Sequence, residues 1–472
     1  MYSSAKNIKI PPVLKKMHEI FSRGGFRSYL VGGAVRDILM GLPPHDYDVA
    51  TDAKPEDVMR LFHRVIPTGI AHGTVTVHLM GYHIETTTFR TESGYSDGRH
   101  PDSVAYAASI EDDLSRRDFT MNAVAVDLAD GKLVDPFSGR GDIKEKLIRA
   151  VGNPHERFGE DGLRPVRAIR FASQLKFRIE KYTYSDIFEG ETLAVVQKIS
   201  IERFRDEFIK MLASDEPSVA LKMLEKTGIL ALFIPELLEG RGCLQSDSRG
   251  FHDFDVLDHL FYACDGAPKD NLTVRLAALF HDIGKPKTKR VLASNGIETI
   301  TFYNHERISA DMTKKILTRL RFPAKTVASV SHLVAEHMFH YESAWSDAAV
   351  RRFIVRTGTE SIDDLFDLRL ADIYGMKRSP VRMHDSAVGK NIVELKKRIE
   401  AVQKENSALS LKDLAVSGDD LADAGIPRGK EMGRVLKELF DTVLDDPKEN
   451  TKEKLLTIAR NIYRKDGKDD AK

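Results

Sequence analysis

Short apolar runs separated by turn residues characterise the chain from Ser28 to about Asp135. Val, Thr and Tyr, which favour β-strands, concentrate in the runs at residues 28–33, 45–51, 73–80, 82–89 and 123–128. Helical periodicity appears instead at residues 33–40 and 55–62, and Lys54-Pro55 is typical of a helix start. The pattern predicts an α+β N-terminal domain built on a mixed sheet.

Helical periodicity dominates the chain after residues 152–154. Clusters of Pro and Gly near residues 235–250 and 376–390 interrupt it and suggest domain boundaries. A length of 472 residues corresponds to roughly three domains of about 150 residues. From these breaks we expect domains at residues 1–150, 151–250, 251–376 and 377–472.

Composition and charge limit the class of protein. The 71 basic and 71 acidic residues argue against one overall basic field for nucleic acid, but they leave room for a local basic groove. No apolar run approaches the roughly 18 residues of a membrane span, and the N-terminus lacks the apolar core of a secretory signal. Cys243 and Cys264 are too few for a disulfide framework. We expect a cytoplasmic protein with no membrane partner.

The stretch YLVGGAVRDILMGLPPHDYDVA at residues 29–50 places two glycines between an apolar run and a helix. Such a turn lets backbone N–H groups approach a phosphate, and Arg36 adds a charge-assisted contact one turn later. Asp46 and Asp48 follow at i and i+2 in a strand-like run, so both carboxylates are expected on one sheet face. With Glu85 as a third ligand, they suit two Mg²⁺ ions for nucleotidyl transfer.

Four segments in this order, LVGGAVRD, DYDVATDA, RRDFTMNAVA and EDGLRPVRAIRF, resemble the class II tRNA nucleotidyltransferases. These are the CCA-adding enzymes and their bacterial poly(A) polymerase relatives, and the resemblance covers nearly the whole chain. It implies a nucleotidyltransferase palm domain followed by an elongated all-α neck, body and tail that hold tRNA. It also implies that Gly33, Arg36 and Arg117 contact the incoming nucleotide and that Asp46 and Asp48 bind Mg²⁺.

Asp161 and Arg164 stand three residues apart at an expected helix start, so their side chains project to nearly the same side. Cytosine and adenine share an exocyclic amino donor, whereas uracil and guanine present a carbonyl there. An Asp that accepts from the amino group and an Arg that donates to the ring nitrogen therefore select CTP and ATP. The alternative is an Asp–Arg salt bridge on the helix, worth about 0.2–0.5 kcal/mol.

The resemblance assigns nucleotide binding to Arg167 and Arg170 as well. Nine residues at about 3.6 per turn place Arg170 roughly opposite Asp161, beside an apolar stripe, which favours a structural role for it. Glycines and polar residues at 90–101 indicate a mobile loop. In the family, a loop here accompanies the switch from adding C to adding A; an ordinary surface loop is the alternative.

An adjacent His281-Asp282 pair ends a helical segment, with His259 upstream and Asp372 downstream. These four residues resemble the ligand set of HD-superfamily phosphohydrolases, which cleave phosphoesters with a divalent metal. Imidazole and carboxylate ligands suit Mg, Mn, Fe, Ni or Co rather than a structural zinc. Further candidates, for a second ion or for phosphate binding, are His305, His332 and His337.

The predicted function is template-independent addition of CCA to tRNA from CTP and ATP, with a phosphohydrolase side activity in the HD domain. Within nucleotidyl transfer, the alternatives are a CC-adding enzyme, an A-adding enzyme and a poly(A) polymerase. An alternative of another class is an HD phosphohydrolase whose N-terminal domain only recognises RNA. The resemblance assigns the neck to residues 151–250, the HD domain to 251–376 and the tRNA-binding body and tail to 377–472.

Overall fold

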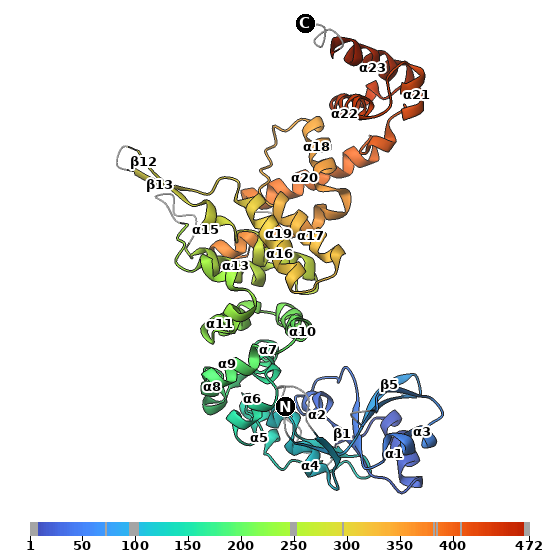
Figure 1. Cartoon of the computed structure of the whole chain (residues 1–472), viewed down its shortest axis with the longest axis vertical. Coiled ribbons are helices and arrows are strands. Elements are labelled where there is room, and N and C mark those ends of the chain that lie inside the picture. The colour runs from blue at the N-terminus through green and yellow to red at the C-terminus, as the bar shows by residue number, and fades with distance from the viewer. Residues whose placement is uncertain are drawn as a thin grey trace. The chain divides into compact units, whose positions relative to one another are not determined.

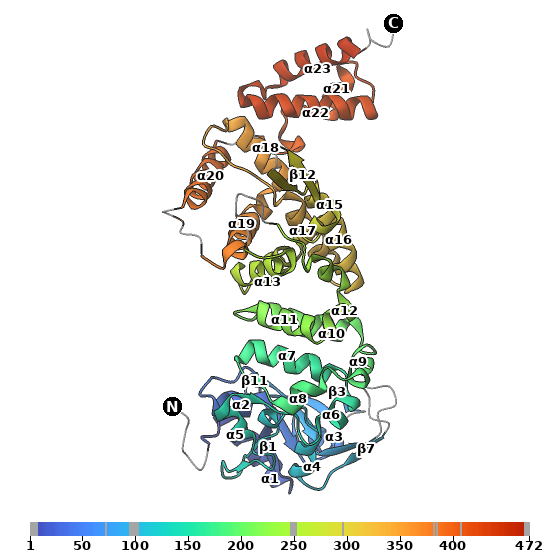
Figure 2. The ribbon, with the colours of Figure 1, turned by 90° about the vertical axis from the view of Figure 1, so that its left-hand side faces the viewer.

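The computed structural model describes residues 8–70, 73–93, 103–245, 253–294, 297–380, 383, 386–405 and 408–466. Contacts divide the chain into two compact units (Figure 1, Figure 2). The first comprises Met1–Leu238 with Arg319–Phe322, and the second comprises Glu239–Thr318 with Pro323–Lys472. The finer division into four domains stays a prediction.

A mixed sheet organises the first unit, as the sequence pattern predicted. Its strands lie in the order β3-β4-β5-β2-β1-β8-β9, where β2 and β5 are parallel and the other neighbours are antiparallel. The strands are β1 Ser28–Val31, β2 Asp48–Thr51, β3 Val65–Gly69, β4 Thr74–Leu79, β5 Tyr82–Thr88, β8 Ala125–Asp127 and β9 Leu133–Val134. Two further pairs are β6 Arg90–Ser93 with β7 Ser103–Tyr106, and β10 Leu147–Ile148 with β11 Arg178–Ile179.

Alternation along β5 separates the two faces of this sheet. Ile84, Thr86 and Thr88 are buried, and Ile84 belongs to the core that α1 also fills with its apolar face. Glu85 and Thr87 alternate with them and therefore point to the opposite face. That second face of the sheet carries the polar side chains of the first candidate site.

After the last strand of the seven-stranded sheet, the first unit continues in sequence mostly as helices. Helix α7 packs against α10 and α11 (Figure 2). Its buried stripe includes Val166 and Ile169, as the sequence pattern indicated. The helices are α1 Pro12–Arg23, α2 Gly33–Leu39, α3 Pro55–Leu61, α4 Ile110–Ser115, α5 Gly139–Glu145, α6 Pro154–Glu160, α7 Leu163–Leu175, α8 Lys181–Asp186, α9 Gly190–Val196, α10 Ile201–Leu212, α11 Pro217–Lys226 and α12 Ile229–Phe233.

The second unit is helical apart from one hairpin in the part that the structure describes. Helices α13, α14 and α19 pack against one another at its centre. Its elements are α13 Val256–Gly266, α14 Leu272–Phe280, α15 Lys285–Thr288, β12 Arg290–Ser294, β13 Ile297–Thr301, α16 His305–Arg319, α17 Ala324–Glu336, α18 Asp347–Thr357, α19 Ile362–Lys377, α20 Ala387–Lys404, α21 Gly418–Asp423, α22 Lys430–Asp445 and α23 Lys452–Asp466. Across the described ranges, no helix has both the length and the apolarity that crossing a membrane requires.

The strand expected at residues 45–51 begins only at Asp48. Val31 pairs with Asp48 in the register of β1 and β2, and Gly32, with φ 73°, turns the chain out of β1 directly afterwards. Residues before Asp48 therefore have no neighbour in β1. The prediction that Asp46 and Asp48 alternate within one strand is wrong for this reason.

Candidate active sites

The turn between β1 and α2 brings the backbone close to Asp48. Gly32 has φ 73° and ψ −141°, a conformation that residues with a Cβ atom rarely adopt. A Cβ atom there would lie 3.2 Å from Oδ2 of Asp48 and 3.3 Å from Nη1 of Arg117. Gly32 therefore makes the turn possible and leaves room for two charged side chains.

Asp48 and Glu85 are register neighbours on the parallel strands β2 and β5. Both line a cavity of about 350 Å³. Burial and the adjacent Glu85 raise the pKa of Asp48 to about 6, although the nearby Arg117 opposes this. Two hard carboxylates that repel each other in this way form a donor set that a divalent cation such as Mg²⁺ satisfies.

Asp46 lies before β2, with 78% of its side chain exposed. Its Oδ2 lies 2.8 Å from Nδ1 of His45, and Asp46 is not among the described residues that line the cavity. Asp46 nevertheless contributes to the raised pKa of Asp48, so the two carboxylates interact electrostatically.

Asp113 of α4 is a buried residue that the sequence reasoning missed. Its Oδ2 accepts a hydrogen bond from Nη2 of Arg117 at 3.3 Å, and its Oδ1 accepts one from Nη2 of Arg116 at 2.7 Å. Burial raises the pKa of Asp113, but the two arginines outweigh it and hold the pKa below its ordinary value. Nε of Arg117 is buried without a hydrogen-bond partner among the described residues, so the guanidinium keeps a donor for a bound anion.

Asp161 and Arg164 line the same cavity as Asp48. Asp161 lies in the short link between α6 and α7 rather than inside a helix, and Arg164 lies in the first turn of α7. The Asp161 carboxylate accepts hydrogen bonds from Arg203 at 3.0 and 2.7 Å, whereas Arg164 donates to Glu160 and to the carbonyl of Arg116. Each residue thus has its own partner, and the simple Asp161–Arg164 salt bridge is absent from the described contacts.

Arg167 and Arg170, both on α7, have different surroundings. Arg167 lines the cavity and is bonded to Asp118 at 2.7 Å. Burial raises the pKa of Asp118, but Arg167 and its hydrogen bonds outweigh this and lower the pKa to about 2. Arg170 is buried, is bonded to Glu207, and is not among the described cavity residues. These contacts agree with the structural role that helix geometry favoured for Arg170.

Arg36 lies on the helix that Gly33 begins and is not among the described residues that line the cavity. Its guanidinium donates hydrogen bonds to Oδ1 of Asp37 at 2.7 Å and to Oδ1 of Asn122 at 3.2 Å, and it lies over the ring of Phe171. Its role toward a nucleotide stays a prediction. The loop predicted at residues 90–101 lies outside the described residues from 94 onward.

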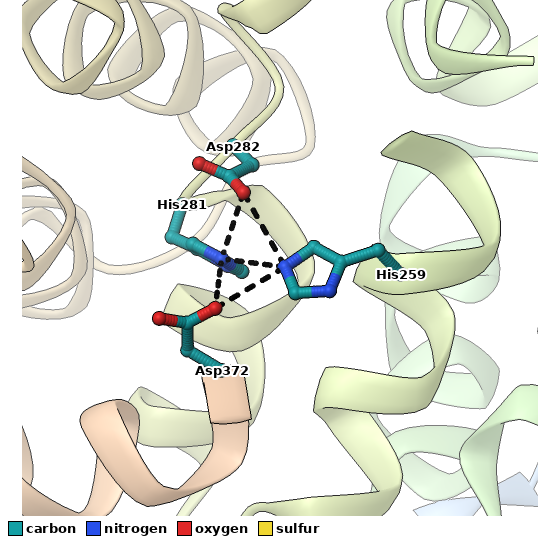
Figure 3. Close-up of side chains that lie close together, drawn as sticks. All are labelled: His259, His281, Asp282 and Asp372. Atoms are coloured by element: carbon teal, nitrogen blue, oxygen red, sulfur yellow. Dashed lines mark hydrogen bonds and ion pairs between the residues drawn. The ribbon is translucent and has the colours of Figure 1, made fainter. Parts of the chain in front are cut away.

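In the second unit, four buried side chains converge from three helical segments. His259 comes from α13, His281 and Asp282 follow α14, and Asp372 comes from α19 (Figure 3). Nε2 of His259 lies 3.3 Å from both Asp282 Oδ2 and Asp372 Oδ1, and Nε2 of His281 lies 3.2 Å from Asp282 Oδ2. One potential ligand atom from each residue lies within 4.8 Å of the others, an arrangement that suits a single metal ion.

Two glycines allow the helices of this cluster to approach closely. A Cβ atom at Gly375 would lie 2.8 Å from the carbonyl oxygen of His259, so this glycine lets α19 bring Asp372 beside α13. A Cβ atom at Gly284 would lie 2.9 Å from the carbonyl oxygen of His305. The glycine of the His-Asp-Ile-Gly segment therefore lets α16 reach the cluster.

A second group shares Asp282 with the first. Nε2 of His305 lies 3.1 Å from Oδ1 of Asp282, and Nε2 of His337 lies 3.6 Å from the same atom. These three residues also have ligand atoms within 4.8 Å of one another. His332, a further candidate from the sequence, lies outside both groups, and its Nε2 lies 2.7 Å from the carbonyl oxygen of Thr357. The structure therefore does not bring His332 together with the other candidate ligands.

A cavity of about 580 Å³ opens onto Asp282, His305 and Asp372. Two cations line it: Lys285 pairs with Asp282, and Arg369 pairs with Asp372. Burial alone would lower the pKa of His281, but the adjacent carboxylates raise it to about 10. Burial raises the pKa of Asp282 and of Asp372. At Asp282, His281 and Lys285 outweigh burial, and at Asp372 the hydrogen bonds with His259 and His281 outweigh it, so both pKa values lie well below the ordinary range. The cavity therefore brings the cationic side chains of Lys285 and Arg369 beside the candidate metal ligands.

Three family models match successive parts of the chain. The "Poly A polymerase head domain" matches residues 28–149, the "Probable RNA and SrmB- binding site of polymerase A" matches residues 176–240, and the "HD domain" matches residues 249–377. The first contains the Asp48–Glu85 site and the last contains the histidine cluster. Fold and sites together define a nucleotidyltransferase with an HD domain, and both families use divalent metals.

Full-length relatives identify the family. The chain is 35% identical over 435 residues to a CCA-adding enzyme of Lactobacillus johnsonii, covering 92% of each chain. It is 34% identical over 462 residues to one of Limosilactobacillus fermentum, covering 96% of each. The solved Bacillus stearothermophilus CCA-adding enzyme in complex with CTP matches with a TM-score of 0.72 and 27% identity, over 98% of this chain and 100% of that one. The chain belongs to the CCA-adding enzyme family.

Proposed function

We propose that this chain adds CCA to tRNA 3′ ends without a nucleic-acid template, using CTP and ATP. The observation that carries the proposal is that Asp48 and Glu85 line the same cavity as Asp161 and Arg164. Asp48 and Glu85 can act at the reacting phosphates, while Asp161 and Arg164 recognise the base. Support also comes from the relatives, which are CCA-adding enzymes, and from a similar structure solved with CTP.

Asp48, Glu85 and Asp46 are the residues we assign to Mg²⁺. The repulsion between Asp48 and Glu85, visible in the raised pKa of Asp48, is what a cation would relieve. When bound, such ions activate a 3′-hydroxyl and stabilise the departing pyrophosphate. Arg117 supplies a cationic donor beside them, and its unpartnered Nε is suited to a phosphate oxygen.

Base selection is assigned to Asp161 and Arg164. The carboxylate accepts from the amino group of cytosine or adenine, and the guanidinium donates to the adjacent ring nitrogen. The bonds of Arg164 to Glu160 and to the Arg116 carbonyl fix its orientation in the cavity wall. Uracil and guanine would place a carbonyl against the Asp161 carboxylate, leaving two acceptors face to face.

The proposal is tested with tRNAs that lack the last three, two or one nucleotides of the CCA end, each supplied with one labelled nucleoside triphosphate. We expect CTP incorporation on the first two substrates and ATP incorporation on the third, with UTP and GTP at least about 100-fold slower. Incorporation of UTP at a rate like that of CTP contradicts the base-reading assignment. Failure to add the final A would indicate a CC-adding enzyme, and repeated A addition to unrelated RNA a poly(A) polymerase.

A second activity is favoured by the buried histidine–aspartate groups. We propose that the HD domain hydrolyses phosphomonoesters or phosphodiesters with a divalent ion held by His259, His281, Asp282 and Asp372. Manganese, iron, nickel, cobalt or magnesium fits this donor set, and the group of Asp282, His305 and His337 can hold a second ion. Lys285 and Arg369 are suited to hold the substrate phosphate.

Residues 151–250 and 377–472 are proposed to hold tRNA. The RNA-binding family model over residues 176–240 supports the first of these assignments. Binding through phosphates would weaken steeply with salt. The cytoplasmic location inferred from the sequence stays a prediction.

Replacing Gly32 with alanine is expected to slow nucleotide addition by about 100-fold, because the new Cβ displaces Asp48 and Arg117. The strained backbone also lowers the free energy of unfolding by about 1–3 kcal/mol. Gly41→Ala is a matched control: Gly41 has φ 76° but open space around its Cβ position. Kinetics and denaturant unfolding of both variants separate crowding from backbone strain. Equal activity of the two variants contradicts the crowding argument.

A further inference from the structure

Arg203 stands out because it joins two separate helical segments inside the candidate nucleotide cavity. It lies in the first turn of α10, some 40 residues after Asp161 in the chain. Nη1 donates to Oδ1 of Asp161 at 3.0 Å, and Nη2 donates to Oδ2 at 2.7 Å. Both side chains are mostly buried, with 22% and 19% exposed, and both residues line the cavity. Such a two-point pair fixes both the position and the plane of a carboxylate.

The backbone alone does not fix the Asp161 side chain. Asp161 has an extended conformation, φ −146° and ψ 111°, in the link after α6. One local bond holds it: the backbone N–H of Leu163 donates to Oδ1 at 2.9 Å. Arg203 supplies the remaining hydrogen bonds that the structure describes for this carboxylate. The orientation of the base-reading group therefore depends on a residue of another helix.

We propose that Arg203 is a positioning residue for base selection, an inference that rests on the proposed CCA addition. The two hydrogen bonds from Arg203 hold the Asp161 carboxylate in one orientation, and a carboxylate only accepts hydrogen bonds. It therefore accepts from the amino group of cytosine or adenine. A carboxylate turned away from this orientation would no longer meet the amino group that distinguishes cytosine and adenine from uracil and guanine, so the ion pair maintains base selection.

The chemistry of the pair leaves Asp161 free to bind a base. A carboxylate has about four lone-pair sites, and Arg203 with Leu163 occupies three of them. One site remains for the single amino donor that a base presents. Arg164, which is bonded to Glu160, stays available for the ring nitrogen.

The test compares Arg203→Met with Arg203→Lys on tRNA that lacks CCA, measuring kcat/KM for CTP and for UTP. We expect the CTP/UTP ratio to fall by about 10- to 100-fold in Arg203→Met, and Arg203→Lys to recover part of the loss because it keeps the charge but not the two-point geometry. The matched control is Arg205→Met on the same helix. Arg205 pairs with Asp206 and is not among the described cavity residues.

The CTP/UTP ratio of kcat/KM is the measurement that would not change if Arg203 only stabilised the fold. Equal losses of CTP and UTP addition in Arg203→Met, with an unchanged ratio, overturn the inference; so does the same ratio change in Arg205→Met. A double-mutant cycle with Asp161→Asn gives an independent check, because the two changes should alter the ratio less than additively. If wild-type protein adds neither CTP nor ATP, the proposed function fails; if wild type is active and selective but Arg203→Met is equally selective, only this inference fails.

Discussion

Replacing Asp48 with alanine is expected to slow nucleotide addition by at least about a thousand-fold, since several kcal/mol of transition-state stabilisation depend on the cation that this carboxylate is proposed to hold. Asp48 is the aspartate of the pair that actually lines the cavity, directly beside Glu85. The measurement is single-turnover addition of CTP to tRNA that lacks CCA. Asp48→Asn, which keeps the shape but not the charge, should lose nearly as much.

The same substitution should not destabilise the metal-free protein. A folded-state pKa of about 6, raised from the ordinary 3.8, means that ionised Asp48 destabilises the metal-free fold above pH 6, by up to about 3 kcal/mol. The penalty disappears as pH falls below the ordinary value. Denaturant unfolding in chelator at pH 8 should therefore show Asp48→Ala to be at least as stable as wild type.

Asp52→Asn is the matched control for both measurements. Asp52 follows β2 but pairs with Arg27, at 2.8 Å, and is not among the described residues of the cavity. Its loss should leave nucleotide addition within about twofold. Nucleotide addition that persists in Asp48→Ala would falsify the two-metal assignment, and a large loss of stability in chelator would contradict the repulsion between Asp48 and Glu85.

The parts of the Asp48–Glu85 site that depend on residues close together in the sequence could be predicted. The turn at Gly32 needs only a strand, a glycine and a helix in succession, and the period of two along β5 places Glu85 on the open face of the sheet. Asp46 was placed wrongly because strand ends depend on pairing. The turn at Gly32 removes the β1 partner that residues before Asp48 would have needed.

Long-range partners were beyond prediction from one sequence. Arg203 looks like an ordinary charged residue on an amphipathic helix, yet the fold makes it the partner of Asp161, 42 positions earlier in the chain. The local alternative, a salt bridge between Asp161 and Arg164, failed for the same reason: stronger partners come from elsewhere in the chain. Pairing across more than 40 positions leaves no periodic signal. The pair of Asp113 and Arg117 is different: it is local, at the spacing of four residues that the helix rule could have found.

The histidine cluster, too, has residues that the sequence could identify and residues that it could not. The adjacent His281-Asp282 pair indicated a metal site, but spacing could not separate His305 and His337 from His332. His305 and His337 lie at the start of α16 and the end of α17, where α-helix termini converge on Asp282, whereas His332 lies within α17 and faces Thr357. The position of each histidine within its helix therefore determines whether it reaches Asp282. Helix ends are the feature that is predicted least reliably from a sequence.

Replacing Asp282 with asparagine is expected to remove phosphoester hydrolysis by at least about a thousand-fold while CCA addition remains near the wild-type rate. Asp282 is the one residue shared by both groups of candidate ligands, so its loss weakens both. Hydrolysis is measured with a chromogenic phosphodiester in Mn²⁺ or Ni²⁺, and bound metal is measured separately after dialysis, where the variant should retain less than a tenth of the wild-type amount.

His340→Ala is the control for this variant, because His340 is 79% exposed and pairs only with Glu342 among the described ion pairs, a few residues from His337. It should keep both the metal and the hydrolysis. Metal retained by Asp282→Asn would contradict the shared-ligand assignment. If hydrolysis disappears together with CCA addition, the substitution has unfolded the chain. If hydrolysis alone is lost, the hydrolytic chemistry belongs to the HD domain, because Asp48 and its cavity lie in the other compact unit.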